Sequence, residues 1–145
     1  MIEYTVKVHE NGDKCWYLDG KRHRKDGPAI EHANGDKSWF LNGKLHREDG
    51  PASEWSNGNK YWYINDVLHR EDGPAVEYAD SSKYWFINGK RHREDGPAIE
   101  WADGTKQWYL NGVEVTEDDV MNRSKELTVS EISKLLGYDV KIVKG

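Results

Sequence analysis

The sequence predicts a mainly β protein, a single-layer antiparallel array of β-hairpin repeats that ends in a small α/β cap. Three observations predict this fold. A tryptophan recurs every 23 residues, each repeat carries Asn-Gly signals typical of hairpin turns, and the segments between these signals suit strands of about five residues. We therefore expect an N-terminal capping strand (1–10), five repeats (11–113) and a C-terminal cap (114–145).

The repeat keeps its phase through the chain. The five repeat tryptophans are Trp16, Trp39, Trp62, Trp85 and Trp108. Four copies also share a histidine, a glycine and a proline at constant offsets, namely His23, His46, His69 and His92, Gly27, Gly50, Gly73 and Gly96, and Pro28, Pro51, Pro74 and Pro97. Only 36% of the 145 residues are hydrophobic but 12% are aromatic, and the mean hydropathy is −0.97. We expect a thin, repeated core of aromatic rings rather than a globular aliphatic core.

The Asn-Gly turns set an expected register. If Asn34-Gly35 forms a two-residue type I′ turn, Ile30 lies opposite Trp39. Ile30, Trp39 and Leu41 then share the core face, and Glu31 and Phe40 lie on the other face. At the rim, an aromatic ring of one strand would face a lysine of the next strand, a cation–π contact of about 0.5–1 kcal/mol where it is exposed. These expected pairs are Trp55 with Lys60, Tyr78 with Lys83, and Trp101 with Lys106.

The motif of an aromatic pair followed by Asn-Gly-Lys-x-His resembles MORN-type hairpin repeats and the related bacterial antitoxin-like repeat proteins. It is seen in residues 85–92, and the acidic-Gly turn Asp103-Gly104 follows it. The resemblance covers residues 11 to about 113. It implies an elongated antiparallel β-array, a MORN-like solenoid, used mainly for protein contacts and in some members for membranes. MORN units usually place glycine after the histidine, whereas this chain places Arg24, Arg47, Arg70 and Arg93 there and continues into an Asp-Gly-Pro corner.

Both ends of the array depart from the repeat, as the edges of a β-array must if they are not to pair with other chains. Residues 2–8 alternate apolar and polar side chains, which predicts a starting strand paired with residues 16–18. In the fifth copy Val115 replaces the repeat histidine and no Gly-Pro corner follows. We expect the array to stop there.

Two capping-box signals predict helices in the C-terminal cap, at Thr116 with Asp119 and at Thr128 with Glu131. The second helix would carry an apolar stripe of Val129, Ile132, Leu135 and Leu136 and end at Gly137, before a short strand with Tyr138, Val140 and Ile142. Packing on the last hairpin is the favoured interpretation of this stripe, and a partner-docking element is the alternative. Residues 127–144 also resemble the tails of small phage-encoded proteins.

Histidine, arginine and acidic residues occur together in four copies, as in His46-Arg47-Glu48-Asp49. Equivalent residues of adjacent copies should lie roughly 10 Å apart, which is too far to share a zinc ion bound at about 2 Å. We therefore expect no metal site, and expect the Asp49 carboxylate to accept across the corner either from the His46 imidazole or from a backbone N–H in an Asx-type turn. A repeat also offers identical groups rather than the unlike groups of a catalytic cleft, and no nucleophile elbow or phosphate loop appears. The prediction is a protein that is not an enzyme and has no cofactor.

The candidate binding residues form a ridge along the repeats, flanked by the rim aromatics. They are Arg24, His46, Arg47, His69, Arg70, His92 and Arg93, with Trp55, Tyr78 and Trp101. A phosphate-bearing ligand or an acidic partner would suit such a ridge. The competing interpretation is a solvated edge that is neutralised by the adjacent acids Glu48, Asp49, Glu71, Asp72, Glu94 and Asp95.

The net charge of −5 disfavours binding to nucleic acid or to an anionic membrane. No apolar run approaches the roughly 20 residues that span a bilayer, and the N-terminus does not have the pattern of a signal peptide, so we expect a cytoplasmic protein. The favoured function is a non-enzymatic protein-interaction module that binds and modulates a bacterial cytosolic protein. Two alternatives are a phage-encoded inhibitor of a bacterial defence or toxin system, acting in the host cytoplasm, and a protein that sequesters a nucleotide or small anion.

Overall fold

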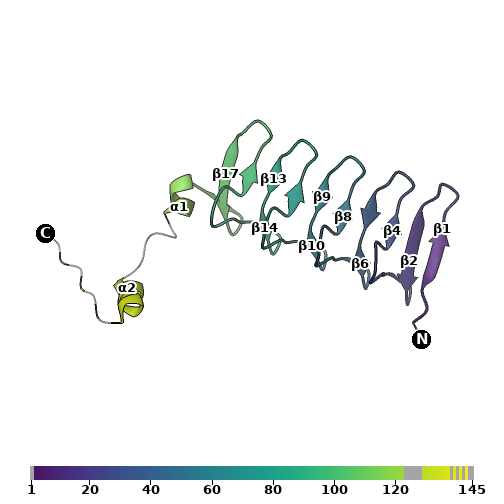
Figure 1. The fold of residues 1–145 in the computed structure, drawn as a ribbon, viewed down its shortest axis with the longest axis horizontal. Coiled ribbons are helices and arrows are strands. Elements are labelled where there is room, and N and C mark those ends of the chain that lie inside the picture. The colour runs from purple at the N-terminus through teal and green to yellow at the C-terminus, as the bar shows by residue number, and fades with distance from the viewer. Residues whose placement is uncertain (1, 123–128, 138, 140, 142, 144–145) are drawn as a thin grey trace.

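The structure is a computed structural model that describes residues 2–122, 129–137, 139, 141 and 143. It confirms the predicted fold class, because the chain is mainly β and its hairpins stand side by side in an elongated antiparallel array (Figure 1). Two short helices follow the array, α1 (Glu117–Met121) and α2 (Val129–Leu136). Neither described helix is long and apolar enough to cross a membrane.

One sheet runs the length of the array, and its strands follow one another in chain order with antiparallel pairing. They are β1 (Thr5–Val8), β2 (Lys14–Leu18), β4 (Ile30–Glu31), β5 (Lys37–Ser38), β8 (Ser53–Glu54), β9 (Lys60–Tyr61), β12 (Val76–Glu77), β13 (Lys83–Tyr84), β16 (Ile99–Glu100), β17 (Lys106–Leu110) and β18 (Val113–Val115). Each repeat therefore supplies a pair of strands to the sheet, as the hairpin signals predict.

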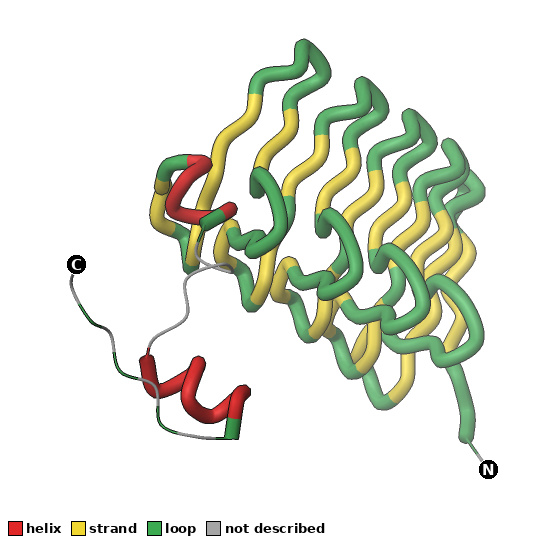
Figure 2. Tube along the Cα trace, turned by 60° about the vertical axis from the view of Figure 1, so that its left-hand side comes forward, coloured by secondary structure: helices red, strands yellow, loops and turns green. Residues whose placement is uncertain are grey.

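A second row of short hairpins lies below the main sheet (Figures 1 and 2). Its strands are β6 (Phe40–Leu41) with β7 (Lys44–Leu45), β10 (Tyr63–Ile64) with β11 (Val67–Leu68), and β14 (Phe86–Ile87) with β15 (Lys90–Arg91), while β3 (Lys21–Arg22) pairs with β2. The repeat tryptophan stands between the two rows, and Trp39 N–H donates to the Ala52 carbonyl at 2.7 Å.

The first turn of each repeat is not the expected type I′ turn. Gly35 N–H donates to the His32 carbonyl at 3.0 Å, His32 N–H donates to the Asp36 carbonyl at 2.9 Å, and Gly35 has a φ of +98°. This is a type I turn closed by a bulge, a three-residue loop whose last position is left-handed and therefore favours glycine; Ser81, with a φ of +80°, takes this position in the fourth copy. Ile30 therefore lies opposite Ser38, and the predicted pairing of Ile30 with Trp39 is wrong by one residue.

The second turn of each repeat is a two-residue type I′ turn. Asn42 and Gly43 have φ values of +52° and +82°, and Leu41 lies opposite Lys44. The Asn-Gly sequence has this geometry because asparagine and glycine tolerate the left-handed region better than other residues. The same dipeptide thus forms two different turns within one repeat.

The core is thin, as the composition predicts, but the expectation that aromatic rings form it is wrong: the buried apolar residues are mostly alanine, isoleucine and valine, and Tyr109 is the one aromatic residue among those described as buried. The alanine that follows each corner proline is fully buried, and these residues are Ala29, Ala52, Ala75 and Ala98. Among the described residues the largest fully buried side chains are Ile99 and Val120. The array therefore depends on contacts between neighbouring copies more than on a central hydrophobic core.

A starting strand is present at the N-terminus, but it covers only Thr5–Val8 of the expected residues 2–8, and its partners are residues 14–17 instead of 16–18. Strand β1 pairs with β2 in antiparallel register, with Val6 opposite Trp16 and Val8 opposite Lys14. Both valines stay exposed, so the strand contributes backbone hydrogen bonds rather than a buried face. It supplies a partner for the edge of the first complete repeat.

At the C-terminal end, helix α1 packs on β17. Its Thr116 cap is a complete capping box, in which Asp119 N–H donates to Thr116 Oγ1 and Thr116 N–H donates to Asp119 Oδ2, and Val120 is only 1% exposed. Helix α2 lies apart from the hairpins in Figures 1 and 2, and Leu135 is 74% exposed. The predicted cap at Thr128 and the expected strand with Tyr138, Val140 and Ile142 fall outside the described residues.

This arrangement predicts that α1, and not α2, protects the end of the sheet. Replacing Val120 by Asp should lower the free energy of unfolding by about 2–4 kcal/mol, because a buried carboxylate there has no partner. Replacing Leu135 by Asp should change it by less than about 0.5 kcal/mol, as for other exposed positions. Urea denaturation followed by tryptophan fluorescence measures both. A large loss in the Leu135 variant would instead show that α2 packs on the array.

Candidate functional site

An arginine is stacked on the repeat tryptophan in four copies. In the second copy Arg47 Cζ lies 3.9 Å from the Trp39 ring centroid. Arg47 Nε donates to Asp49 Oδ1 at 3.0 Å, and Nη1 donates to the Pro51 carbonyl at 3.1 Å and to Glu54 Oε1 at 3.0 Å. We call this set of contacts the arginine clamp. Its other copies stack Arg24, Arg70 and Arg93 on Trp16, Trp62 and Trp85 at 3.9–4.1 Å.

The clamp explains the Asp-Gly-Pro corner. The aspartate accepts from the guanidinium and the proline supplies a carbonyl acceptor. The glycine lies so close to the arginine that a Cβ on Gly50 would be 2.9 Å from Arg47 Cζ, while its φ is not positive. Glycine is therefore required here by close approach and not by backbone conformation.

The repeat histidine ties each copy to the next one. His46 Nδ1 accepts from Asn65 N–H at 3.2 Å, at the start of the following type I′ turn. The equivalent bonds are Asn42 N–H to His23, Asn88 N–H to His69, and Asn111 N–H to His92, at 2.9–3.0 Å. An accepting Nδ1 places the imidazole proton on Nε2, which in His46 faces Glu48 at 3.5 Å. The predicted bond between His46 and Asp49 is wrong, because Asp49 accepts from Arg47 instead.

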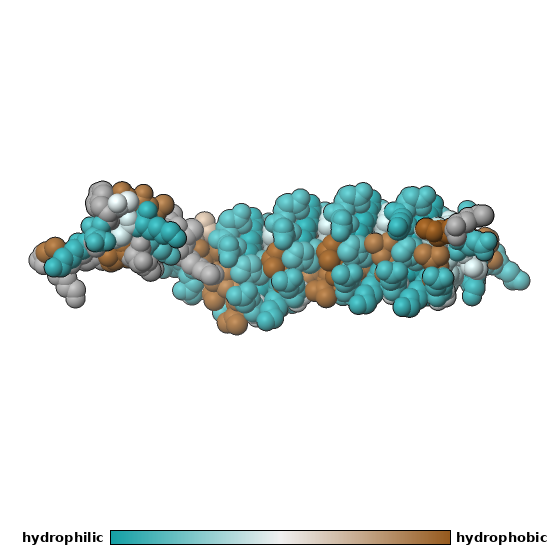
Figure 3. Space-filling model, turned by 90° about the horizontal axis from the view of Figure 1, so that it is seen from below, coloured by the Kyte–Doolittle hydropathy of each residue, from teal (hydrophilic) through white to brown (hydrophobic). Residues whose placement is uncertain are grey.

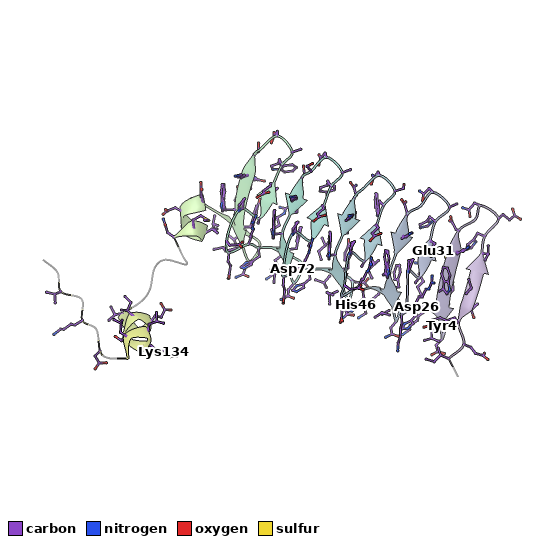
Figure 4. All side chains as sticks on the ribbon, viewed as in Figure 1. Tyr4, Asp26, Glu31, His46, Asp72 and Lys134 are labelled. Atoms are coloured by element: carbon purple, nitrogen blue, oxygen red, sulfur yellow. The ribbon has the colours of Figure 1, made fainter. Side chains whose placement is uncertain are left out.

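The corner loops present acidic groups to solvent. The Arg47 side chain is 23% exposed, whereas that of Asp49 is 88% exposed, and the other clamps repeat this contrast. In Figure 4 the corner residues Asp26, His46 and Asp72 lie along the lower edge of the array. Open hollows of 560–730 Å³ separate successive corners. The ridge arginines are thus held inside the corner, and the charges that reach outward are carboxylates, except that the exposed Lys25 holds the position of Glu48 in the first copy.

The lower side of the array is mostly hydrophilic, with its hydrophobic residues in separate patches (Figure 3). Within the described part of the chain, no cluster of three or more histidine, cysteine or acidic side chains has a metal-binding arrangement. Cys15 is buried and free.

The rim aromatics lie on a different surface from the clamps. Their expected lysine contacts are wrong, because Lys60 lies opposite Glu54 and Lys83 opposite Glu77. The one-residue change of register sends these lysines to the other face of the sheet. Trp55 instead contacts Tyr61, with ring centroids 5.5 Å apart.

Five rings form a continuous row across five successive strands. We call this row the aromatic ladder, and its members in order are Trp55, Tyr61, Tyr78, Tyr84 and Trp101. Neighbouring ring centroids lie 5.3–6.1 Å apart. Trp55 and Trp101, at its two ends, are 47% and 40% exposed. Trp55 is held in place by its indole N–H, which donates to Ser53 Oγ at 3.0 Å.

Burial raises the pKa of the Tyr61 hydroxyl, and the neighbouring Tyr78 adds to the effect. The pKa of Tyr84 is raised by the same two causes in the same order. Both phenols therefore stay neutral at physiological pH and remain hydrogen-bond donors. The ladder combines apolar ring surface with neutral polar groups.

The ladder is confined to the later copies of the repeat. The position of Trp55 holds His32 one period earlier and His9 two periods earlier, and the position of Tyr61 holds Cys15, Ser38 and Gln107 in other copies. A residue that the repeat fold requires should recur in every complete copy. The clamp residues do recur, in four copies. Rings found only in some copies are therefore not required by the fold.

The sequence prediction named three of the five ladder rings, Trp55, Tyr78 and Trp101. It missed Tyr61 and Tyr84, because the expected register placed them away from the rim. Comparing each repeat position across the five copies is the signal that distinguishes them, since these two tyrosines replace small or polar residues. No family model matches the chain, and no curated protein matches it.

The clamp geometry predicts coupled effects of its arginine and glycine. Arg70→Lys should lower the free energy of unfolding by about 1–3 kcal/mol, because lysine keeps the charge but not the planar fork. Gly73→Ala should cost about 1–3 kcal/mol by overpacking against the guanidinium, and less in the Arg70→Lys background. Urea denaturation of the wild type, the two single variants and the double variant measures the four free energies of unfolding of this double-mutant cycle.

Arg91→Lys is the matched control, because Arg91 is exposed and stacks only loosely on Tyr109 at 5.4 Å. It should change the free energy of unfolding by less than about 0.5 kcal/mol. Strictly additive costs for Arg70 and Gly73 would contradict the clamp.

Proposed function

We propose that this protein is a non-enzymatic protein-interaction module and that the aromatic ladder is its contact surface. The observation that carries the proposal is a continuous row of five rings at positions that the repeat does not require. Tryptophan and tyrosine are enriched at interface hot spots, where a large ring surface is buried at small entropic cost. A sheet fixed by repeated clamps offers these rings already in place, which favours binding.

The polar groups of the repeat support a binding function over catalysis. Each histidine uses Nδ1 to hold the next turn, and each clamp arginine is engaged by a ring, a carbonyl and two carboxylates. Catalysis needs different groups that converge on one substrate. The repeat histidines and clamp arginines are instead the same in four copies and are engaged in hydrogen bonds within the array.

The same contacts favour a protein partner over a nucleotide. A phosphate could reach the clamp arginines only by displacing Asp49, Glu54 or their equivalents, and it would approach past exposed carboxylates. We propose instead a MORN-like repeat protein, in line with the motif resemblance and the elongated hairpin array. Its partner would be a bacterial cytosolic protein with basic groups at the contact.

The experiment is an affinity purification from the native host with wild-type bait and a Trp55→His/Trp101→His variant. Histidine is chosen because His32 occupies the same repeat position, so the fold should tolerate it. The variant should lose most of the captured partner, because two exposed rings at the ends of the contact are removed. Its melting temperature should stay within a few degrees of the wild type, since exposed substitutions cost little.

Two controls locate the surface. Val113→Ser removes an exposed apolar side chain outside the ladder and should retain the partner. Glu48→Gln/Glu71→Gln alters the exposed corners and should also retain it. Loss of the partner in the corner variant with retention in the ladder variant would place the contact on the corner loops and refute the proposal.

A further inference from the structure

The ladder has a definite period along the array. Trp55, Tyr78 and Trp101 occupy the same position in three consecutive copies, and each copy contributes two strands. With strands about 4.8 Å apart, these rings recur about every 9.6 Å along the array. Tyr61 and Tyr84 fill the intervals. A ligand that lies along the ladder can therefore repeat its contacts at this spacing.

A polyproline II helix has nearly the same period. It rises about 3.1 Å per residue with three residues per turn, so the same face returns about every 9.3 Å. An α-helix returns its face after seven residues, about 10.5 Å, and a β-strand after two residues, about 6.7 Å. Over the two intervals of the ladder the polyproline II mismatch is only about 0.6 Å. Extended proline-rich chain therefore fits the spacing better than either alternative.

The ring geometry suits proline side chains. From Tyr61 to Trp101 successive rings meet at interplanar angles of 76–89°, so ring faces and ring edges alternate along this part of the ladder, and Trp55 is tilted by 49° to Tyr61. Aromatic-lined surfaces of this kind seat the rings of proline-rich segments, whose conformation is formed before binding. A polyproline II backbone has no internal hydrogen bonds, so its carbonyls can accept from the tyrosine hydroxyls.

The border of the ladder is acidic. Trp55, Tyr78 and Trp101 are the first residues of the first turns, since their carbonyls accept from Gly58, Ser81 and Gly104. Two of the three ladder turns carry an aspartate, Asp80 and Asp103, and the two preceding turns carry Asp13 and Asp36. A lysine follows each turn directly, but Lys60 and Lys83 lie opposite Glu54 and Glu77. Backbone N–H donors from Ala33 and Ser56 hold the pKa values of Asp13 and Asp36 below their usual range. The border is therefore negative at physiological pH and complements basic side chains.

We propose that the aromatic ladder binds a proline-rich segment flanked by basic residues, which lies in the polyproline II conformation along the array from β8 to β16. This inference rests on the proposed function and names the chemistry of its partner. The segment places a proline against the rings of each of the three copies and its basic side chains beside the first turns.

The test uses the full chain and a fluorescently labelled synthetic peptide of about nine residues, three polyproline II turns, with arginine at both ends. Fluorescence anisotropy measures the affinity. Trp55→His/Trp101→His should weaken binding at least about tenfold, and added salt should weaken it further. A peptide with glycine in place of proline and the same arginines should bind at least about tenfold more weakly, because it must lose more conformational entropy.

A gain-of-binding variant keeps the test independent of any loss of folding. His32→Trp/Ser38→Tyr places in the second copy the residues that the third copy carries at Trp55 and Tyr61, and so extends the ladder by two rings. It should bind a peptide lengthened by one turn several-fold more tightly than the wild type does.

Three outcomes overturn the proposal. Equal binding of the proline and glycine peptides would show attraction by charge alone. Displacement of the peptide by a neutral glucan oligosaccharide at lower concentration would assign the ladder to sugars. Absence of peptide binding, while the Trp55→His/Trp101→His bait still loses its cellular partner, would refute the polyproline II ligand and leave the protein-interaction function standing. If that bait loses no partner, the proposed function itself fails.

Discussion

The structure depends on an arginine that is held flat between a tryptophan ring and a glycine. The stack fixes the direction in which the chain leaves the corner, and the proline carbonyl and two carboxylates hold the guanidinium in that plane. The next strand then starts from the same geometry in each clamped copy. A sheet built in this way has even spacing without a large core, which is how a chain with 36% hydrophobic residues folds as an array.

The histidine extends this constraint from one copy to its neighbour. Its Nδ1 accepts from a backbone N–H of the following type I′ turn. The aspartate, asparagine or serine at the end of each of the first four first turns accepts a backbone N–H from the next first turn, as Asp36 does from Ser56. Both edges of the array are thereby linked between copies. The aromatic ladder inherits its regular spacing from these links.

Much of this architecture can be predicted from the sequence, because a 23-residue period and paired turn signals specify hairpins and their order. The register of the first turn cannot, because Asn-Gly suits both a type I′ turn and a type I turn with a glycine bulge. This one-residue difference in register changes the face of the sheet to which Trp39, Tyr61 and Tyr84 are assigned. The stacking of the clamp arginines on tryptophan is a second feature that could not be predicted from the sequence. A charged residue beside acidic residues suggests a solvent-exposed ridge, and only the structure shows the ring that covers it. The arginines' constant distance of three residues from a corner glycine is the signal that points to close packing.

Residues found in every clamped copy hold the array together, whereas the rings confined to some copies are the surface that we propose binds the partner. Hydroxyl-radical footprinting of the array, alone and with its captured partner bound, tests this most directly. We expect reduced oxidation of the Trp55 and Trp101 rings at the ends of the ladder and unchanged oxidation of the prolines and histidines in the corner loops. Protection of the corner loops with the ladder tryptophans still fully oxidised would contradict the proposal.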